Sequence, residues 1–78
     1  MNITAINPKY QSLVNRAVNW LTKYNELDNQ RNVADSNGDD RLYAKLDKKC
    51  QNAFDKYLEY ADELPSREQS QIEKSELY

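Results

Sequence analysis

Few residues of this chain could take part in catalysis, and their types exclude most enzyme chemistry. There is no histidine, which excludes histidine-based catalytic triads and histidine-ligated metals. The single cysteine, Cys50, excludes an internal disulfide and a cysteine-rich zinc site, and the single glycine excludes a glycine-rich phosphate loop. Carboxylates are plentiful, but no two of them are grouped in a predicted apolar cleft, as paired acid–base catalysis requires. The sequence therefore predicts a protein without enzymatic activity and without a cofactor.

Acidic and amide side chains between positions 35 and 40 invite comparison with a calcium-binding loop. Aligning Gly38 with the sixth position of such a loop places Val33 at the first position and Ala44 at the twelfth, where a carboxylate should chelate the ion. The acids are better explained as helix caps, and Cys50, on a predicted apolar face, as a small buried side chain. We therefore predict no metal site.

Five basic residues form a ridge along one side of a predicted helix. They fall within about 100° of arc, on the side away from the apolar residues. This basic ridge consists of Arg41, Lys45, Lys48, Lys49 and Lys56. Its ordinary interpretation is a solvated helix face, and the alternative is a surface that binds the phosphates of a nucleic acid. The chain carries a net charge of −2, so it exerts no long-range attraction on nucleic acid or on an anionic membrane.

The elements that position these residues are predicted to form a single all-α domain with a thin core, because the chain has only 78 residues. Its predicted segments are an N-terminal arm (1–7), a helix (8–35), a turn (36–40), a second helix (41–64) and a short, marginal helix (66–76). In the two long segments apolar residues recur with a helical period, across arcs of about 180° and about 120°. Asp28 and Arg31 interrupt the first arc, so we expect the first helix to fray between Asp28 and Asp35.

Capping residues support these boundaries. Asn7 is suited to cap the first helix, because a proline follows it at the first helical position. Gly38 supplies the left-handed residue that ends a helix, and the aspartates at 39–40 can cap the next one. Ser66, with Gln69 three residues later, predicts a capping box at the third helix.

The short turn makes the two long helices antiparallel neighbours in a hairpin. Val14, Val18 and Leu21 lie outside the seam that a hairpin buries, and the third helix offers only Ile72 and Leu77 to cover them. The isoleucines of the N-terminal arm could cover part of this face. Because an apolar face wider than one partner can cover implies another partner, we predict that two copies of the chain form a dimeric four-helix bundle.

Aromatic residues on the apolar arcs indicate where a partner would bind. Tyrosine combines a large apolar area with a hydroxyl that needs water or a partner, which suits either the edge of a core or a protein interface. The residues that we predict to contact a partner are Trp20, Tyr24 and Tyr57, together with Val14, Val18 and Leu21.

The leading functional hypothesis is a small, non-enzymatic interaction protein that docks its helix faces onto a macromolecular partner, with another protein as the expected partner. One alternative is a nucleic-acid-binding regulator that uses the basic ridge. Another, suggested by a short chain rich in Asn, Lys and Tyr, is an accessory protein of a phage or mobile element that inhibits a host machine. No apolar run approaches the ~20 residues of a membrane helix, and the lone thiol without a recognisable signal peptide favours a cytoplasmic location.

Overall fold

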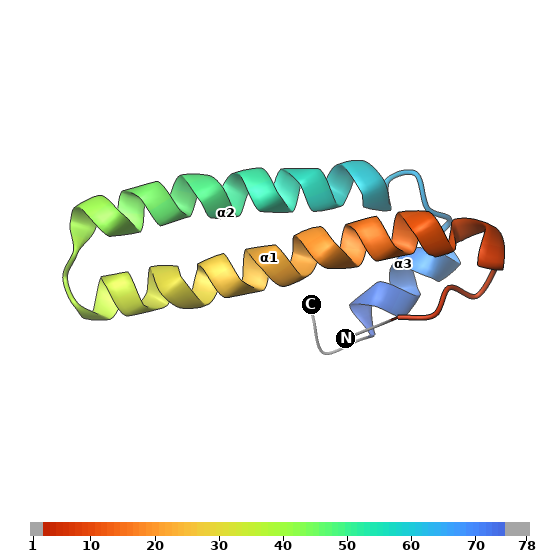
Figure 1. Ribbon diagram of the computed structural model, residues 1–78, viewed down its shortest axis with the longest axis horizontal. Helices are drawn as coiled ribbons and strands as arrows, with labels where there is room; N and C mark the ends of the chain where they lie inside the picture. Colours follow the sequence, from red (N-terminus) through yellow and green to blue (C-terminus); the bar gives the residue numbers. More distant parts are fainter. Residues whose placement is uncertain (1–2, 75–78) are drawn as a thin grey trace.

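The computed structural model describes residues 3–74, and the regular elements in this range are all helical. They are a 3-10 helix η1 (Pro8–Tyr10) and three α-helices: α1 (Gln11–Ser36), α2 (Asp40–Ala61) and α3 (Ser66–Glu73). Figure 1 shows α1 and α2 side by side as an antiparallel hairpin, with α3 and the N-terminal arm beside the first half of α1. The all-helical hairpin predicted from the sequence is therefore confirmed.

The predicted caps at both ends of the first helix are present. The side chain of Asn7 accepts a hydrogen bond from the backbone N–H of Lys9, and a proline opens η1. At the turn, Gly38 has φ of +70°, in the left-handed region that glycine adopts without strain. The carboxylate of Asp39 accepts a hydrogen bond from the N–H of Leu42 at 3.1 Å, which caps α2. The turn is therefore determined by residues within and beside it.

The first long helix remains regular up to the turn, so the predicted fraying after Asp28 is wrong. The guanidinium of Arg31 donates hydrogen bonds to Asp28 of the same helix and, at 2.7 Å, to Asp47 of α2. Three residues later, Ala34 is buried. An ion pair across the hairpin and a small buried side chain thus stabilise the part of α1 where the apolar stripe stops.

The junction between α2 and α3 differs from the predicted capping box. The second helix ends at Ala61 rather than at residue 64, and the residue that precedes α3 is Pro65, whose side chain makes no capping bond. The amide of Gln69 instead donates to the carbonyls of Ala61 and Leu64, at 2.7 and 2.9 Å. The Gln69 side chain can bond to Ala61 because the last carbonyl groups of a helix have no hydrogen-bond donor within that helix. Gln69 therefore joins α3 to the end of α2.

The third helix is a packed element, although the sequence suggested a marginal one. Ile72 is fully buried, and Glu68 is 2% exposed. The carboxylate of Glu68 accepts hydrogen bonds from the backbone N–H groups of Ile6, at 3.0 Å, and Asn7, at 2.8 Å. This carboxylate holds the N-terminal arm against α3. Leu77, the other apolar residue that we expected this part of the chain to offer, lies outside the described residues.

The wide apolar face of α1 is covered by the chain itself. Val14, Val18 and Leu21 are buried in one core cluster with Ile3 and Ile72, which come from the N-terminal arm and from α3. The expectation that the third helix is too poor in apolar residues to cover this face is therefore wrong, because one isoleucine and the arm suffice. Since this face is covered, its width is no longer a reason to expect a second copy of the chain. The dimeric bundle stays a prediction.

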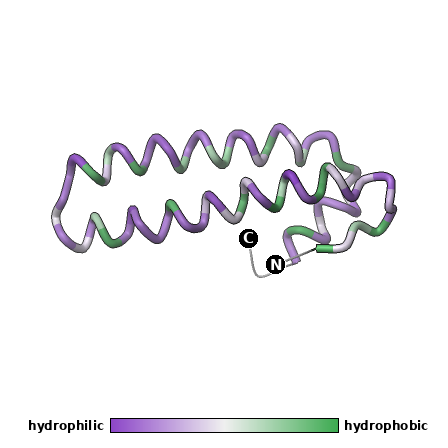
Figure 2. The backbone as a smooth tube through the Cα atoms, in the orientation of Figure 1, coloured by the Kyte–Doolittle hydropathy of each residue, from purple (hydrophilic) through white to green (hydrophobic). Residues whose placement is uncertain are grey.

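The two ends of the hairpin differ in how much of their surface is covered. Figure 2 shows hydrophobic positions recurring along both long helices. At the open end, the arm and α3 add a third layer to them, whereas near the turn α1 and α2 have only each other (Figure 1). Among the large hydrophobic side chains that are exposed in residues 3–74, Val33, Leu42 and Tyr43 lie near the turn, whereas Ile6 lies in the arm and Leu58 near the end of α2. None of the described helices combines the length and the apolar character that crossing a membrane requires.

Candidate functional site

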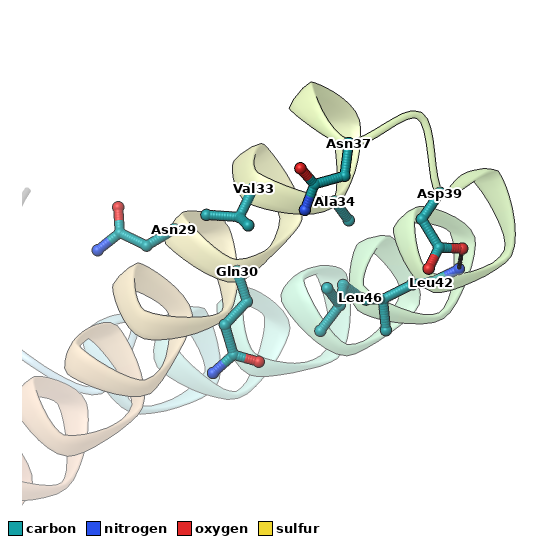
Figure 3. Close-up of a pocket in the computed structure, with 8 residues that line it drawn as sticks. All are labelled: Asn29, Gln30, Val33, Ala34, Asn37, Asp39, Leu42 and Leu46. Carbon is teal, nitrogen blue, oxygen red and sulfur yellow. Dashed lines mark hydrogen bonds between the residues drawn. The ribbon is translucent and has the colours of Figure 1, made fainter.

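A groove lies between the last turns of α1 and the first turns of α2 (Figure 3). Its volume is about 370 Å³, near the lower limit for pockets that hold small ligands. The residues that line this turn groove are Asn29, Gln30, Val33, Ala34, Asn37, Asp39, Leu42 and Leu46. An open groove of this size suits a few side chains of a partner better than an enclosed small molecule.

The apolar part of the turn groove consists of a buried floor and two exposed side chains. Ala34 of α1 and Leu46 of α2 are buried. Val33 on α1 is 59% exposed and Leu42 on α2 is 45% exposed, and both line the groove. Single exposed aliphatic residues are ordinary on protein surfaces, but two that share one groove form a small apolar patch.

The two walls of the turn groove differ in charge. The α1 wall carries the amides of Asn29, Gln30 and Asn37, which are neutral. The α2 wall carries Leu42, which also borders a second hollow of about 520 Å³. That second hollow is lined by Asp39, Arg41, Leu42, Ala44 and Lys45. Within residues 3–74, the one charged residue that lines the turn groove itself is Asp39, whose carboxylate caps α2, whereas the cations of this wall, Arg41 and Lys45, line the neighbouring hollow.

An ion pair joins the two helices in the same half of the hairpin as the turn groove. The hydrogen bond from Arg31 to Asp28, followed by the one to Asp47, holds the pKa of Arg31 above its ordinary value. Cys50, one turn beyond Leu46 along α2, is 1% exposed, and this burial raises the pKa of its thiol. A neutral, buried thiol is a poor nucleophile, so Cys50 acts as a small core residue.

The basic ridge faces solvent over most of its length. Arg41, Lys45, Lys48 and Lys49 are exposed, and none of them belongs to the ion pairs found among residues 3–74. Lys56 is partly buried and lies 3.6 Å from Glu59. Four exposed cations therefore lie in the first half of α2, and two of them, Arg41 and Lys45, line the hollow next to the turn groove.

Most of the residues predicted to contact a partner lie inside the chain. Tyr57 is 3% exposed, and Val14, Val18 and Leu21 are buried with it in the core. A side chain that its own chain covers offers no surface to a partner, so we do not place an interface on these four residues.

The other two predicted contact residues are half-buried. The ring of Tyr24 packs at a tilt against Phe54, with centroids 5.1 Å apart, and the ring of Phe54 in turn lies 5.6 Å from that of Tyr57. The ammonium of Lys23 lies over the ring of Trp20, at 5.4 Å from its centroid. These aromatic rings form the edge of the core, the interpretation that the sequence left open beside the interface.

The turn groove was not recognised in the sequence, although Leu42 carried a signal. Leu42 lies on the apolar side of its helix but outside the seam that packs against α1. Val33 lies beyond the point where the apolar stripe of its helix stops, so helical periodicity gave it no role.

The described part of the chain holds no group of three histidine, cysteine or acidic residues close enough to bind a metal ion. Comparisons with protein-family models, with curated proteins and with solved structures find no match for this chain.

Proposed function

We propose that this chain is a non-enzymatic interaction module that binds a partner protein in the turn groove. The observation that carries the proposal is the pair of exposed aliphatic side chains, Val33 and Leu42, at one groove above a buried floor. A patch with an apolar centre and a polar rim is the usual composition of a protein interface.

The arrangement of the fold supports this assignment. The open end of the hairpin is closed by three layers and by the hydrogen bonds of Glu68 and Gln69. The turn end is fixed by the Gly38 turn and by the Arg31–Asp47 pair. Because the turn and the ion pair hold the groove in one shape, a partner does not have to order it, and the entropic cost of binding is lower.

The test compares two leucines of the same helix. Leu42 lines the groove, whereas Leu58 is 39% exposed but lies about 24 Å along α2 from it, at 1.5 Å per residue. We expect Leu42→Ser to abolish the capture of partner proteins from a cell lysate, and Leu58→Ser to leave the same captured proteins unchanged. Circular dichroism checks that both variants fold. If wild type and Leu42→Ser capture the same proteins in the same amounts, the groove is not the binding site.

A second candidate function is nucleic-acid binding through the first half of the basic ridge. It is favoured by one observation, the four exposed cations that make no ion pair within residues 3–74. Cations on one helix face can contact successive phosphates, and the resulting affinity falls steeply with salt. Binding in the turn groove, by contrast, requires Leu42, which phosphate contacts through the ridge do not.

A further inference from the structure

We propose that the occupant of the turn groove is an amphipathic helix of a partner protein, with acidic side chains along one edge of its apolar face. This inference rests on the proposed function and specifies the chemistry of the partner. It follows from the shape of the groove, from the charges of its walls and from the kinds of binding that the groove excludes.

The kind of partner segment follows from the walls. Both walls are α-helices whose backbone groups are bonded within the helix, so they offer no strand edge to which an extended peptide could add. The lining contains no aromatic residue, whereas grooves that bind proline-rich segments are lined by aromatics. A helix laid into the groove needs only apolar anchors, and Val33, Leu42 and the floor provide their site.

The length of the groove sets the number of anchors. The α1 wall runs from Asn29 to Asn37, which is about 12 Å at 1.5 Å per residue, or roughly two helical turns. Two or three apolar side chains spaced three and four residues apart cover that length. The partner helix therefore needs a short apolar stripe rather than a long one.

The charge that we expect on the partner helix follows from the exposed cations of α2, which the α1 wall lacks. On α2, Lys45 and Lys49 each lie three residues after a groove leucine, Leu42 and Leu46, and so stand beside them on the same side of the helix. Arg41 and Lys45 border the neighbouring hollow together with Leu42. These cations make no ion pair within the described part of the chain, and acidic side chains of a partner would complement them.

The α1 wall would accept the other edge of the partner helix through its neutral amides. Two acidic residues lie in or beside this stretch of α1: Asp28, which is paired with Arg31, and Asp35, which is exposed and would repel an acidic edge of the partner. The acidic edge of the partner is therefore expected to lie along α2, which sets the orientation of the bound helix.

A second copy of this chain fits the groove poorly. In a two-fold symmetric contact, the cationic α2 wall would face either itself, with repulsion between like charges, or the neutral amides of the α1 wall. The apolar patch is also small, with two half-exposed aliphatic side chains, whereas a stable dimer buries about 1,200 Å² or more.

The inference is tested with a displayed library of amphipathic helical peptides in which the residues beside the apolar stripe are randomised. The library is selected against the full chain and then against Leu42→Ser. We expect peptides that bind only the wild type to be enriched in aspartate and glutamate on one edge. If Leu42-dependent peptides emerge without such enrichment, the groove binds helices but the acidic partner is refuted. If no Leu42-dependent peptide emerges, both the inference and the proposed function fail.

A charge reversal then locates the acidic edge. With the best acidic peptide as the probe, Lys45→Glu is expected to weaken binding roughly fivefold or more, because a favourable pair becomes a repulsive one. Lys48→Glu changes the net charge equally, but Lys48 lines neither hollow, and we expect its effect to stay below about twofold at physiological salt. Equal effects of the two substitutions would refute the proposed orientation of the partner's acidic edge along Lys45.

Discussion

The carboxylate of Glu68 accepts a hydrogen bond from the backbone N–H of Asn7 at 2.8 Å, which joins positions that are 61 residues apart. A second bond from the N–H of Ile6 reaches the other carboxylate oxygen at 3.0 Å. Through this single buried side chain, α3 is attached to the N-terminal arm, and the two together cover the apolar face of α1.

Replacing this carboxylate should therefore detach the third layer. We expect Glu68→Ala to lower the free energy of unfolding by roughly 2–3 kcal/mol, because two backbone N–H groups lose a charged acceptor. Glu73→Ala removes an exposed acid of the same helix and should change stability by less than about 0.5 kcal/mol. Urea unfolding measures both variants, and equal stabilities would show that Glu68 does not hold the arm.

The pair formed by Arg31 and Asp47 should contribute to stability although it lies near the surface. A double-mutant cycle with Arg31→Met and Asp47→Ala is expected to give a coupling free energy of about 1 kcal/mol, because both groups are partly buried and hydrogen-bonded. The same cycle on Lys56 and Glu59, a more exposed pair within α2, should give below about 0.5 kcal/mol. Similar values in both cycles would contradict a specific role for Arg31 in joining the helices.

The turn itself should depend on the backbone of Gly38 rather than on packing. Nothing lies within 4 Å of a Cβ atom built at this position, so a larger residue meets only the strain of φ at +70°. We expect Gly38→Val to destabilise by roughly 1 kcal/mol or more, and Gly38→Asn by clearly less, because asparagine tolerates the left-handed region. Thermal unfolding followed by circular dichroism measures both, and equal losses would point to a cause other than backbone strain.

The parts of the fold that the sequence predicted depend on neighbouring residues. The hairpin and its turn depend on contacts between residues a few positions apart: the left-handed Gly38, the cap from Asp39 and the proline after Asn7. Local patterns in the sequence were therefore sufficient to predict them. The parts that were missed depend on contacts between distant segments. Neither the bond from Asn7 to Glu68 nor the bond from Gln69 back to Ala61 leaves a periodic signal.

The candidate site was missed for a related reason. Burial of Val14, Val18 and Leu21 depends on where the arm and α3 fold, which helical periodicity does not contain. That face is covered, whereas Val33 and Leu42 stay exposed at the opposite end of the hairpin, where no third layer reaches them. The sequence did locate the exposed cations beside it, since a charged helix face needs no tertiary contact to be exposed.

The buried thiol predicts a pH dependence of stability above neutrality. Burial raises the pKa of Cys50 above its ordinary value of about 9.0, so the folded state keeps this proton to a higher pH than the unfolded state does. The contribution of the thiol to the free energy of unfolding is therefore complete below about pH 9.0 and is lost as the pH rises through the folded-state pKa. The loss is at most about 1.4 kcal/mol per pH unit.

Cys50→Ala isolates this effect from the lysines and tyrosines that titrate in the same range. Between about pH 8 and about pH 10, wild type should lose more stability in urea unfolding than the alanine variant does. The variant will be less stable at every pH, because it leaves a small cavity, but its curve should be flatter. Parallel curves would show that the thiol titrates equally in both states.

The basic ridge separates the two candidate functions. Lys45, Lys48 and Lys49 are exposed and make no ion pair within residues 3–74, so changing all three to glutamine should alter the free energy of unfolding by less than about 0.5 kcal/mol. Lys56 is left in place because it pairs with Glu59. Any change in binding by the triple variant then reports on the ridge and not on the fold.

We expect wild type to bind a short RNA hairpin or DNA duplex no more tightly than about 100 µM at physiological salt, because the net charge of −2 opposes the attraction of the ridge. The triple variant should lose affinity for an acidic helical peptide, while Leu42→Ser should abolish that binding. Fluorescence anisotropy with labelled probes measures all of these affinities. Micromolar binding of RNA or DNA, abolished by the lysine changes and with a salt slope lowered by about 0.7–0.9 for each lost contact, would instead assign the ridge to nucleic acid.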